Sequence, residues 1–245
     1  MYVHRFTDRQ KTDVKSTKSN GTKVAARISQ GFSGVFLALL FLLHVLEPEF
    51  DPSWRMISEY ALGQYGWLMS LAFFCWGGSV LALLSALWNR EETRASMVAR
   101  GWMIVIAVAL VGAGLFQTNP ITDPTPRFSH EVHRVCGALV ILTFPIAASL
   151  VAGRLRQGSI RTSRTLRFLT WSTWVNWLTL LTFFASMIIS RVLHPGLERV
   201  GPHVLLGFPN RLMVVAYHIW LLIVASYLTK TAAESPESDS LRTAG

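Results

Sequence analysis

Histidines and carboxylates gather in short segments between the long apolar runs of this chain, and these residue types can carry chemistry. In the segment Ser129-His-Glu-Val-His133 two histidines lie three residues apart, so on a helix they share one face. Imidazole nitrogens and carboxylate oxygens are zinc ligands, and Asp123 lies shortly before the pair. His130, His133 and Asp123 are therefore candidate metal ligands, with zinc as the candidate ion. The alternative, that they are structural hydrogen-bonding groups, stays open.

A second candidate is the Ser58-Glu59 pair, which lies shortly before the second apolar run. Pro48 and Pro52 precede it, and proline favours a fixed, extended path. Ser58 can cap the following helix while Glu59 lies in its first turn, where the helix dipole stabilises an anion. Alternatively, Glu59 points into the mouth of the bundle as a base or a ligand. Under both interpretations Ser58 and Glu59 remain candidate site residues.

The third candidate is Arg211, at the start of the last apolar run, with His218 seven residues later. At 1.5 Å per residue His218 lies roughly 10 Å deeper. An unpaired charge at the membrane edge is costly, so Arg211 must either extend its side chain to water or pair. Glu59 and Asp123 are the candidate anionic partners.

Six apolar runs must position these residues. The chain is 51% hydrophobic and 15% charged, whereas soluble domains are about 25% charged. The runs are apolar on all sides, unlike soluble amphipathic helices, and approach the roughly 20 residues that cross a bilayer. Open sheets are excluded because lipid cannot satisfy an unpaired backbone. We therefore predict an all-α integral membrane bundle of six transmembrane helices, at about Gly31–Leu46, Gly66–Trp88, Gly101–Phe116, Val132–Ala152, Phe168–Ser190 and Leu212–Leu228.

The distribution of Lys and Arg predicts the orientation. Seventeen belong to the two terminal segments and the second and fourth loops, and six to the other loops. Positive residues favour the cytoplasmic side, so both termini are predicted to be cytoplasmic and the odd loops to face outward. We expect a basic disordered tail at residues 1–27, the membrane domain at 28–230 and a second disordered tail at 231–245. The expected location is the plasma membrane, the inner membrane of a bacterium.

Composition excludes several other classes. A disordered protein would be more polar, and two cysteines are too few for a disulfide scaffold or a four-cysteine zinc site. The net charge of +9 would suggest nucleic acid in a soluble protein. Here the basic residues flank apolar runs, so we expect a lipid bilayer as the partner and no nucleic acid.

The order of the short motifs resembles a known family. Ile57-Ser-Glu-Tyr60 precedes the second run, Gly114-Leu-Phe116 leads to Asp123-Pro124, His133 opens the fourth run, and Asn210-Arg211 opens the sixth. This pattern resembles an uncharacterised family of bacterial and archaeal multi-pass membrane proteins, the domain-of-unknown-function family nine-nine-eight, over about residues 30–230. The resemblance implies no activity. It does imply that the motif positions are Ser58, Glu59, Asp123, His133 and Arg211.

We predict one outward-facing site and leave its activity open. The candidate ligand-site residues are Ser58, Glu59, Asp123, His133, Arg211 and His218. The favoured hypothesis is binding or transport of a lipid head group or a small solute. One alternative is an intramembrane metal-dependent hydrolase that acts on lipids. Further alternatives are a haem or quinone protein with His44 and His218 as axial ligands, and a structural subunit. The sequence does not decide whether the protein is an enzyme.

Overall fold

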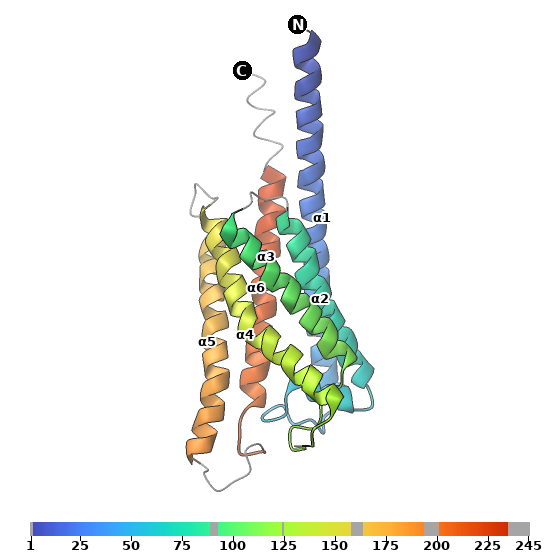
Figure 1. The fold of residues 1–245 in the computed structure, drawn as a ribbon, viewed down its shortest axis with the longest axis vertical. Helices are drawn as coiled ribbons and strands as arrows, with labels where there is room; N and C mark the ends of the chain where they lie inside the picture. The colour runs from blue at the N-terminus through green and yellow to red at the C-terminus, as the bar shows by residue number, and fades with distance from the viewer. Residues whose placement is uncertain (1, 89–92, 124, 158–163, 194–200, 235–245) are drawn as a thin grey trace.

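Six long helices and one short 3-10 helix make up the part of the chain that the structure describes (Figure 1). The structure is a computed structural model that describes residues 2–88, 93–123, 125–157, 164–193 and 201–234, and these ranges contain no strand. All six long helices are long and apolar enough to cross a membrane, which confirms the predicted all-α bundle. The elements are α1 (Tyr2–Leu46), η1 (Ile57–Leu62), α2 (Gly66–Trp88), α3 (Arg94–Leu115), α4 (Phe128–Gln157), α5 (Arg164–Leu193) and α6 (Gly207–Glu234).

The helices form one antiparallel bundle with α2 and α6 most deeply buried. α1 packs against α2 and α6, α3 against α2 and α4, and α5 mainly against α6. The start of α1 and the end of α6 lie at the same end of the bundle (Figure 1). We call this the basic end, because the chain places Arg94, Arg154, Arg156 and Arg164 there. The opposite end, which carries η1, is called the polar end.

Five of the six helices extend beyond the apolar runs that predicted them. α3 begins at Arg94 because Thr93 caps it: the backbone N–H of Ser96 donates to Thr93 Oγ1 at 3.2 Å. At their C-terminal ends α4 and α6 continue past the apolar segment through residues with good helix propensity, such as Arg154 and Gln157 in α4 and Lys230 and Ala233 in α6. The largest difference concerns the N-terminal segment. The sequence predicts a disordered tail at residues 1–27, whereas residues 2–27 form the first part of α1 in the structure. That stretch contains no proline to stop a helix. At the other terminus α6 continues to Glu234, and the remaining residues of the predicted tail lie outside the described ranges.

Aromatic side chains fill the centre of the bundle. Phe144 of α4 and Tyr217 of α6 stack with ring centroids 4.2 Å apart, and Trp76 of α2 and Trp220 of α6 pack around them. The hydroxyl of Tyr217 donates to the carbonyl of Ile141 at 2.9 Å, so this phenol is hydrogen-bonded inside the apolar core. This cluster joins α2, α4 and α6.

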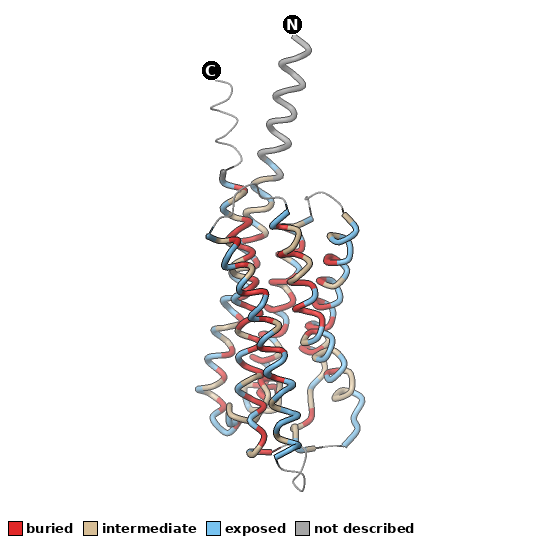
Figure 2. The backbone as a smooth tube through the Cα atoms, turned by 90° about the vertical axis from the view of Figure 1, so that its left-hand side faces the viewer, coloured by how far each residue is buried: buried red, intermediate tan, exposed pale blue. Residues whose placement is uncertain are grey.

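One part of α5 stands apart from the bundle. Between Leu166 and Phe183 buried residues recur every three or four positions, which is the pattern of a helix with one packed face. Beyond Phe183 none of the ten residues Phe184–Leu193 is buried (Figure 2). Ten residues span about 15 Å, roughly half the hydrocarbon thickness of a bilayer. Over that depth no side chain of α5 is buried by the other described elements, although Ser186 and Ser190 are half-buried.

Candidate functional site at the polar end

The first and third loops meet the start of α6 at the polar end. The backbone N–H of Ile57 donates to Asn210 Oδ1 at 3.1 Å, which ties η1 to α6. The backbone N–H of Ile121 donates to Glu59 Oε1 at 2.8 Å, which ties the third loop to η1. Segments more than 60 residues apart in sequence are therefore joined by side chains rather than by secondary structure.

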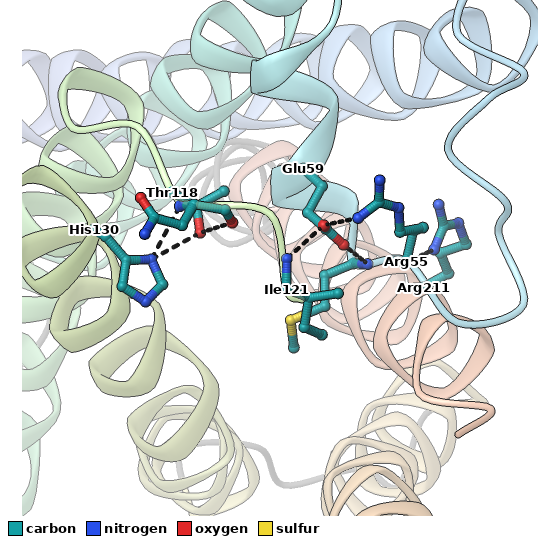
Figure 3. A network of polar contacts seen from close by, with 8 residues as sticks. Arg55, Glu59, Thr118, Ile121, His130 and Arg211 are labelled. Carbon is teal, nitrogen blue, oxygen red and sulfur yellow. Dashed lines mark hydrogen bonds and ion pairs between the residues drawn. The ribbon is translucent and has the colours of Figure 1, made fainter. Parts of the chain in front are cut away.

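Glu59 lies at the centre of one of these connections and is 1% exposed. Besides Ile121, its carboxylate accepts from Arg55 Nη1 at 2.7 Å and from the backbone N–H of Met56 at 3.0 Å (Figure 3). The Met56 contact caps the first turn of η1. The residue that caps here is therefore Glu59, whereas the sequence predicted Ser58 as the cap of the helix in the second apolar run. Ser58 is half-buried, and within the described residues its hydroxyl has no hydrogen-bond partner.

Arg211 has no carboxylate partner among the described residues, which corrects the predicted ion pair with Glu59 or Asp123. Arg211 is 8% exposed, and its guanidinium donates instead to neutral acceptors. Nη2 donates to Tyr60 Oη at 3.0 Å and Nε donates to His44 Nε2 at 2.8 Å. Nη1 faces three backbone carbonyls, those of Pro52, Arg55 and Gly207. The fork of N–H groups therefore fixes the first loop onto the start of α6.

The predicted metal ligands do not form a group. Within the described ranges no three His, Cys, Asp or Glu side chains are placed to share a metal ion. His130 Nδ1 accepts from the backbone N–H of Asn119 at 3.0 Å, and the local partners of Asp123 are Thr125 and Arg127. These local hydrogen bonds and the Arg127 ion pair hold the pKa of Asp123 below its usual value.

His133 has a structural role at the end of α3. Its side chain is 6% exposed, and Nδ1 lies 2.8 Å from the carbonyl of Phe116 and 3.1 Å from that of Ala113. Carbonyls have no proton to give, so Nδ1 carries the proton and donates to both. The last carbonyls of a helix lack intrahelical partners, and His133 supplies one from α4. Nδ1 is therefore not available as a metal ligand, and the ring joins α3 to α4.

His218 does not belong to the polar end. It is fully buried, stacks on Phe36 with centroids 3.9 Å apart, and packs against Trp76. The axial-ligand hypothesis required His44 and His218 to present a ring nitrogen to an iron. His44 Nε2 instead accepts from Arg211, so it has no lone pair left for an iron, whereas His218 Nε2 is buried without a hydrogen-bond partner among the described residues. This geometry gives no support to the haem alternative.

Glu47 is the residue that the site prediction missed. It follows α1 directly and is 1% exposed. Oε1 accepts from the backbone N–H of Tyr65, whereas Oε2 is buried without a hydrogen-bond partner among the described residues. Burial, reinforced by the neighbouring Glu49 carboxylate, raises the pKa of Glu47. The sequence feature that could have identified Glu47 is its position as the first charged residue after a span, where a carboxylate must be either solvated or paired.

Comparison with models of known protein families shows which family this chain belongs to. A family model described as a protein of unknown function (DUF998) matches residues 33–227, which is most of the chain. The chain belongs to the DUF998 family. The resemblance inferred from the motifs is thereby confirmed, and the protein is a multi-pass membrane protein whose described residues include six helices long and apolar enough to span the bilayer. No curated protein and no solved structure is detectably similar to it.

The DUF998 match covers every polar-end residue described above, from His44 to Arg211. Two of these contacts could have been expected from the sequence. Arg55 and Glu59 have the i,i+4 spacing of a helical ion pair, and Asn210 adjoins Arg211. The contacts of Tyr60 and His44 with Arg211 could not, because they depend on how three segments meet in space.

Proposed function

We propose that this membrane protein binds a lipid head group or a small solute at its polar end, and that the group recognised is a protonated amine. The same binding step would serve a transporter. Glu47 is the proposed recognition residue. The positive-inside distribution supports the polar end as the outward face. The ligand would therefore come from outside the cell or from the outer leaflet of the membrane.

The supporting observation is the unpartnered oxygen of Glu47. A buried carboxylate costs several kcal/mol unless a proton, a cation or hydrogen-bond donors compensate it. One oxygen of Glu47 has the Tyr65 N–H, while Oε2 has no donor among the described residues. An ammonium group supplies both the charge and the N–H donors that this oxygen lacks. Protonation of Glu47 alone is the competing outcome, and the experiment below distinguishes the two.

The position of Glu47 is fixed before any ligand binds. Its carboxylate lies against the bare Cα of Gly63: a Cβ atom there would fall 1.8 Å from Glu47 Oε2. Glu59 and Arg211 hold the loop that contains Gly63 with hydrogen bonds at both ends of η1. Because their polar atoms are occupied within the protein, we assign them to positioning and not to ligand contact. A pre-formed site loses less conformational entropy when it binds.

The test is a thermal-stability measurement on the full chain in a neutral detergent. The probes are phosphatidylethanolamine, ethanolamine and phosphatidylglycerol, which separate a lipid amine, a free amine and a lipid without one. We expect an amine-bearing probe to raise the melting temperature of the wild type. Glu47→Gln should abolish that rise, and the matched control Glu131→Gln, at a carboxylate of the same end whose side chain is 45% exposed, should keep it. A rise that survives in Glu47→Gln, or equal effects of all three probes, would contradict the proposal.

A further inference from the structure

We propose that the amine site is an exchange site: when it is empty it carries one proton on the Glu47–Glu49 pair, and it releases that proton when an ammonium group binds. The inference rests on the proposed function and adds how the site handles charge. Glu47 is the buried member of the pair, with one oxygen unpartnered among the described residues, and Glu49 is the exposed member. The proton therefore has a route from the buried carboxyl group to the aqueous side.

The two carboxyl groups act on each other. Burial raises the pKa of Glu47 most, the backbone N–H of Tyr65 lowers it, and Glu49 raises it further as a hydrogen-bond neighbour and as a like charge. Glu49 is the only titratable side chain among the described residues that acts on Glu47 in this way. Two neighbouring carboxylates do not both ionise without cost, so a proton or a cation at the pair is favoured.

The cations of the polar end do not neutralise this pair. Among the described residues, the salt bridges of this end are Arg55–Glu59, Arg127–Asp123 and Arg134–Glu131. Arg211 directs its guanidinium to neutral acceptors. The one donor that the described residues give to the Glu47 carboxylate is the N–H of Tyr65. The charge of an ionised Glu47 must therefore be balanced from outside these residues, and an ammonium group does this.

The exchange leaves the net charge of the site unchanged. In the empty site the proton is held in the O–H bond of a neutral Glu47 carboxyl group. When the ammonium group arrives, that bond breaks and the proton passes by way of the Glu49 carboxylate to water. The Glu47 carboxylate then accepts N–H hydrogen bonds from the ammonium group. One positive charge enters as one leaves, so the buried carboxylate is compensated in both states.

Proton and amine must compete under this scheme. Below the pKa of Glu47 in the empty protein, each ten-fold rise in proton concentration should weaken the apparent affinity for the amine about ten-fold, because one proton has to leave. Above that pKa no proton has to leave, and the affinity should not depend on pH. The amine keeps its own charge throughout, since an alkyl amine such as the lysine side chain titrates near about 10.4.

Isothermal titration calorimetry of the full chain in neutral detergent tests the exchange. The probes are ethanolamine and, in mixed micelles, phosphatidylethanolamine, each titrated from about pH 4.5 to about pH 8, a range that begins near the pKa of an unfolded glutamate. Repeating each titration in two buffers of different ionisation enthalpy gives the number of protons released per amine. We expect about one proton below the pKa of Glu47 and none above it.

Glu49→Gln and Glu131→Gln form a matched pair of variants. Both remove an exposed carboxylate from the polar end, but only Glu49 acts on Glu47. Glu49→Gln should move the fall in amine affinity to lower pH, because the like charge that favours the proton is gone. Glu131→Gln should leave the curve in place. Identical curves for the two variants would overturn the role of Glu49 and with it the proposed pair.

The outcomes separate this inference from the proposed function. Amine binding that is independent of pH and releases no proton would overturn the exchange while the amine site stands. If the wild type binds neither amine probe at any pH, the amine site itself is wrong, and the exchange falls with it. Proton release that persists in Glu47→Gln would also overturn the exchange, because the proton would then come from another group.

Discussion

The Nε–H of Arg211 donates a hydrogen bond to Nε2 of His44 at 2.8 Å, and this bond joins α6 to α1 across 167 residues. Because His44 Nε2 accepts, the proton of the imidazole must be on Nδ1, which faces the carbonyl of Leu40. The imidazole is therefore neutral, and every hydrogen bond of the guanidinium goes to a neutral acceptor: three carbonyls, a phenol and this ring. Such an arrangement depends on the geometry of the guanidinium more than on its charge.

Replacing Arg211 with lysine should destabilise the protein although the charge is retained. A lysine ammonium has three donors on one nitrogen and cannot reach acceptors spread over the guanidinium fork. We expect a loss of about 2–4 kcal/mol in the free energy of unfolding, because several buried acceptors lose their donor. Chemical unfolding in detergent measures it. Arg191→Lys, at an exposed position on α5, is the control and should change nothing. An unaltered stability of Arg211→Lys would show that the fork is not needed.

Replacing Glu59 with glutamine should also weaken the fold. Both carboxylate oxygens accept from N–H groups, so either orientation of the amide turns its NH₂ toward a donor. We expect a cost of about 1–3 kcal/mol. Limited proteolysis of the first loop should accelerate in parallel, because Glu59 holds that loop to the third. Glu49→Gln, which alters an exposed carboxylate, is expected to match the wild type, and equal proteolysis rates in the two variants would contradict the assigned role.

A methyl group at Gly63 should displace the carboxylate of Glu47. The added Cβ would lie 1.8 Å from Oε2, and the backbone offers it no other direction. Overpacking of this kind costs roughly 1–3 kcal/mol. The cost should shrink in the Glu47→Ala background, where the obstructing atoms are absent, so a double-mutant cycle will give a coupling energy. Gly31→Ala, where a Cβ meets nothing within 4 Å, should be neutral or mildly stabilising. Purely additive effects of Gly63→Ala and Glu47→Ala would contradict the contact.

The stability of the wild type should contain a component that falls as pH rises. The pKa of Glu47 in the folded protein is raised by burial, whereas an unfolded glutamate titrates near about 4.3. Between the unfolded and the folded pKa the folded state binds this proton and the unfolded state does not. The resulting stabilisation is fully present below the unfolded pKa and is lost as the pH rises through the folded pKa. Glu47→Gln cannot titrate. The difference in melting temperature between wild type and variant should therefore change with pH, in favour of the variant at high pH. A constant difference from pH 4 to pH 9 would exclude the raised pKa.

Reporter fusions should place the polar end outside the cell. The basic residues predict that fusions after Ser53, Arg127 and Gly201 are external and that both termini are cytoplasmic. An alkaline phosphatase reporter, which is active only outside, should give signal at the three loop positions and none at the termini. A cytoplasmic result at any loop position would reverse the assignment of the two ends.

The sequence predicted the spans well because a helix that crosses the hydrocarbon of a bilayer needs about 20 mostly apolar residues. The second run, Gly66–Trp88, coincides with α2. The polar end was predictable only in part. Glu59 and Arg211 were identified from their charge, but the acceptors of Arg211 are mostly backbone carbonyls, which every residue has and no sequence pattern marks. His133 was assigned to a metal for the same reason: its partners are carbonyls at the end of α3.

The outer part of α5 is free of a constraint that governs the rest of the chain. Where a helix packs on a neighbour, the shape of each side chain is selected by that neighbour, and exchange among Leu, Ile and Phe has a cost. From Phe184 to Leu193 no residue is buried, so no described neighbour encloses these side chains and selects their shape. Relatives can therefore exchange one apolar residue for another along this stretch at little cost to the fold, and the segment can diverge in identity while its hydropathy stays the same.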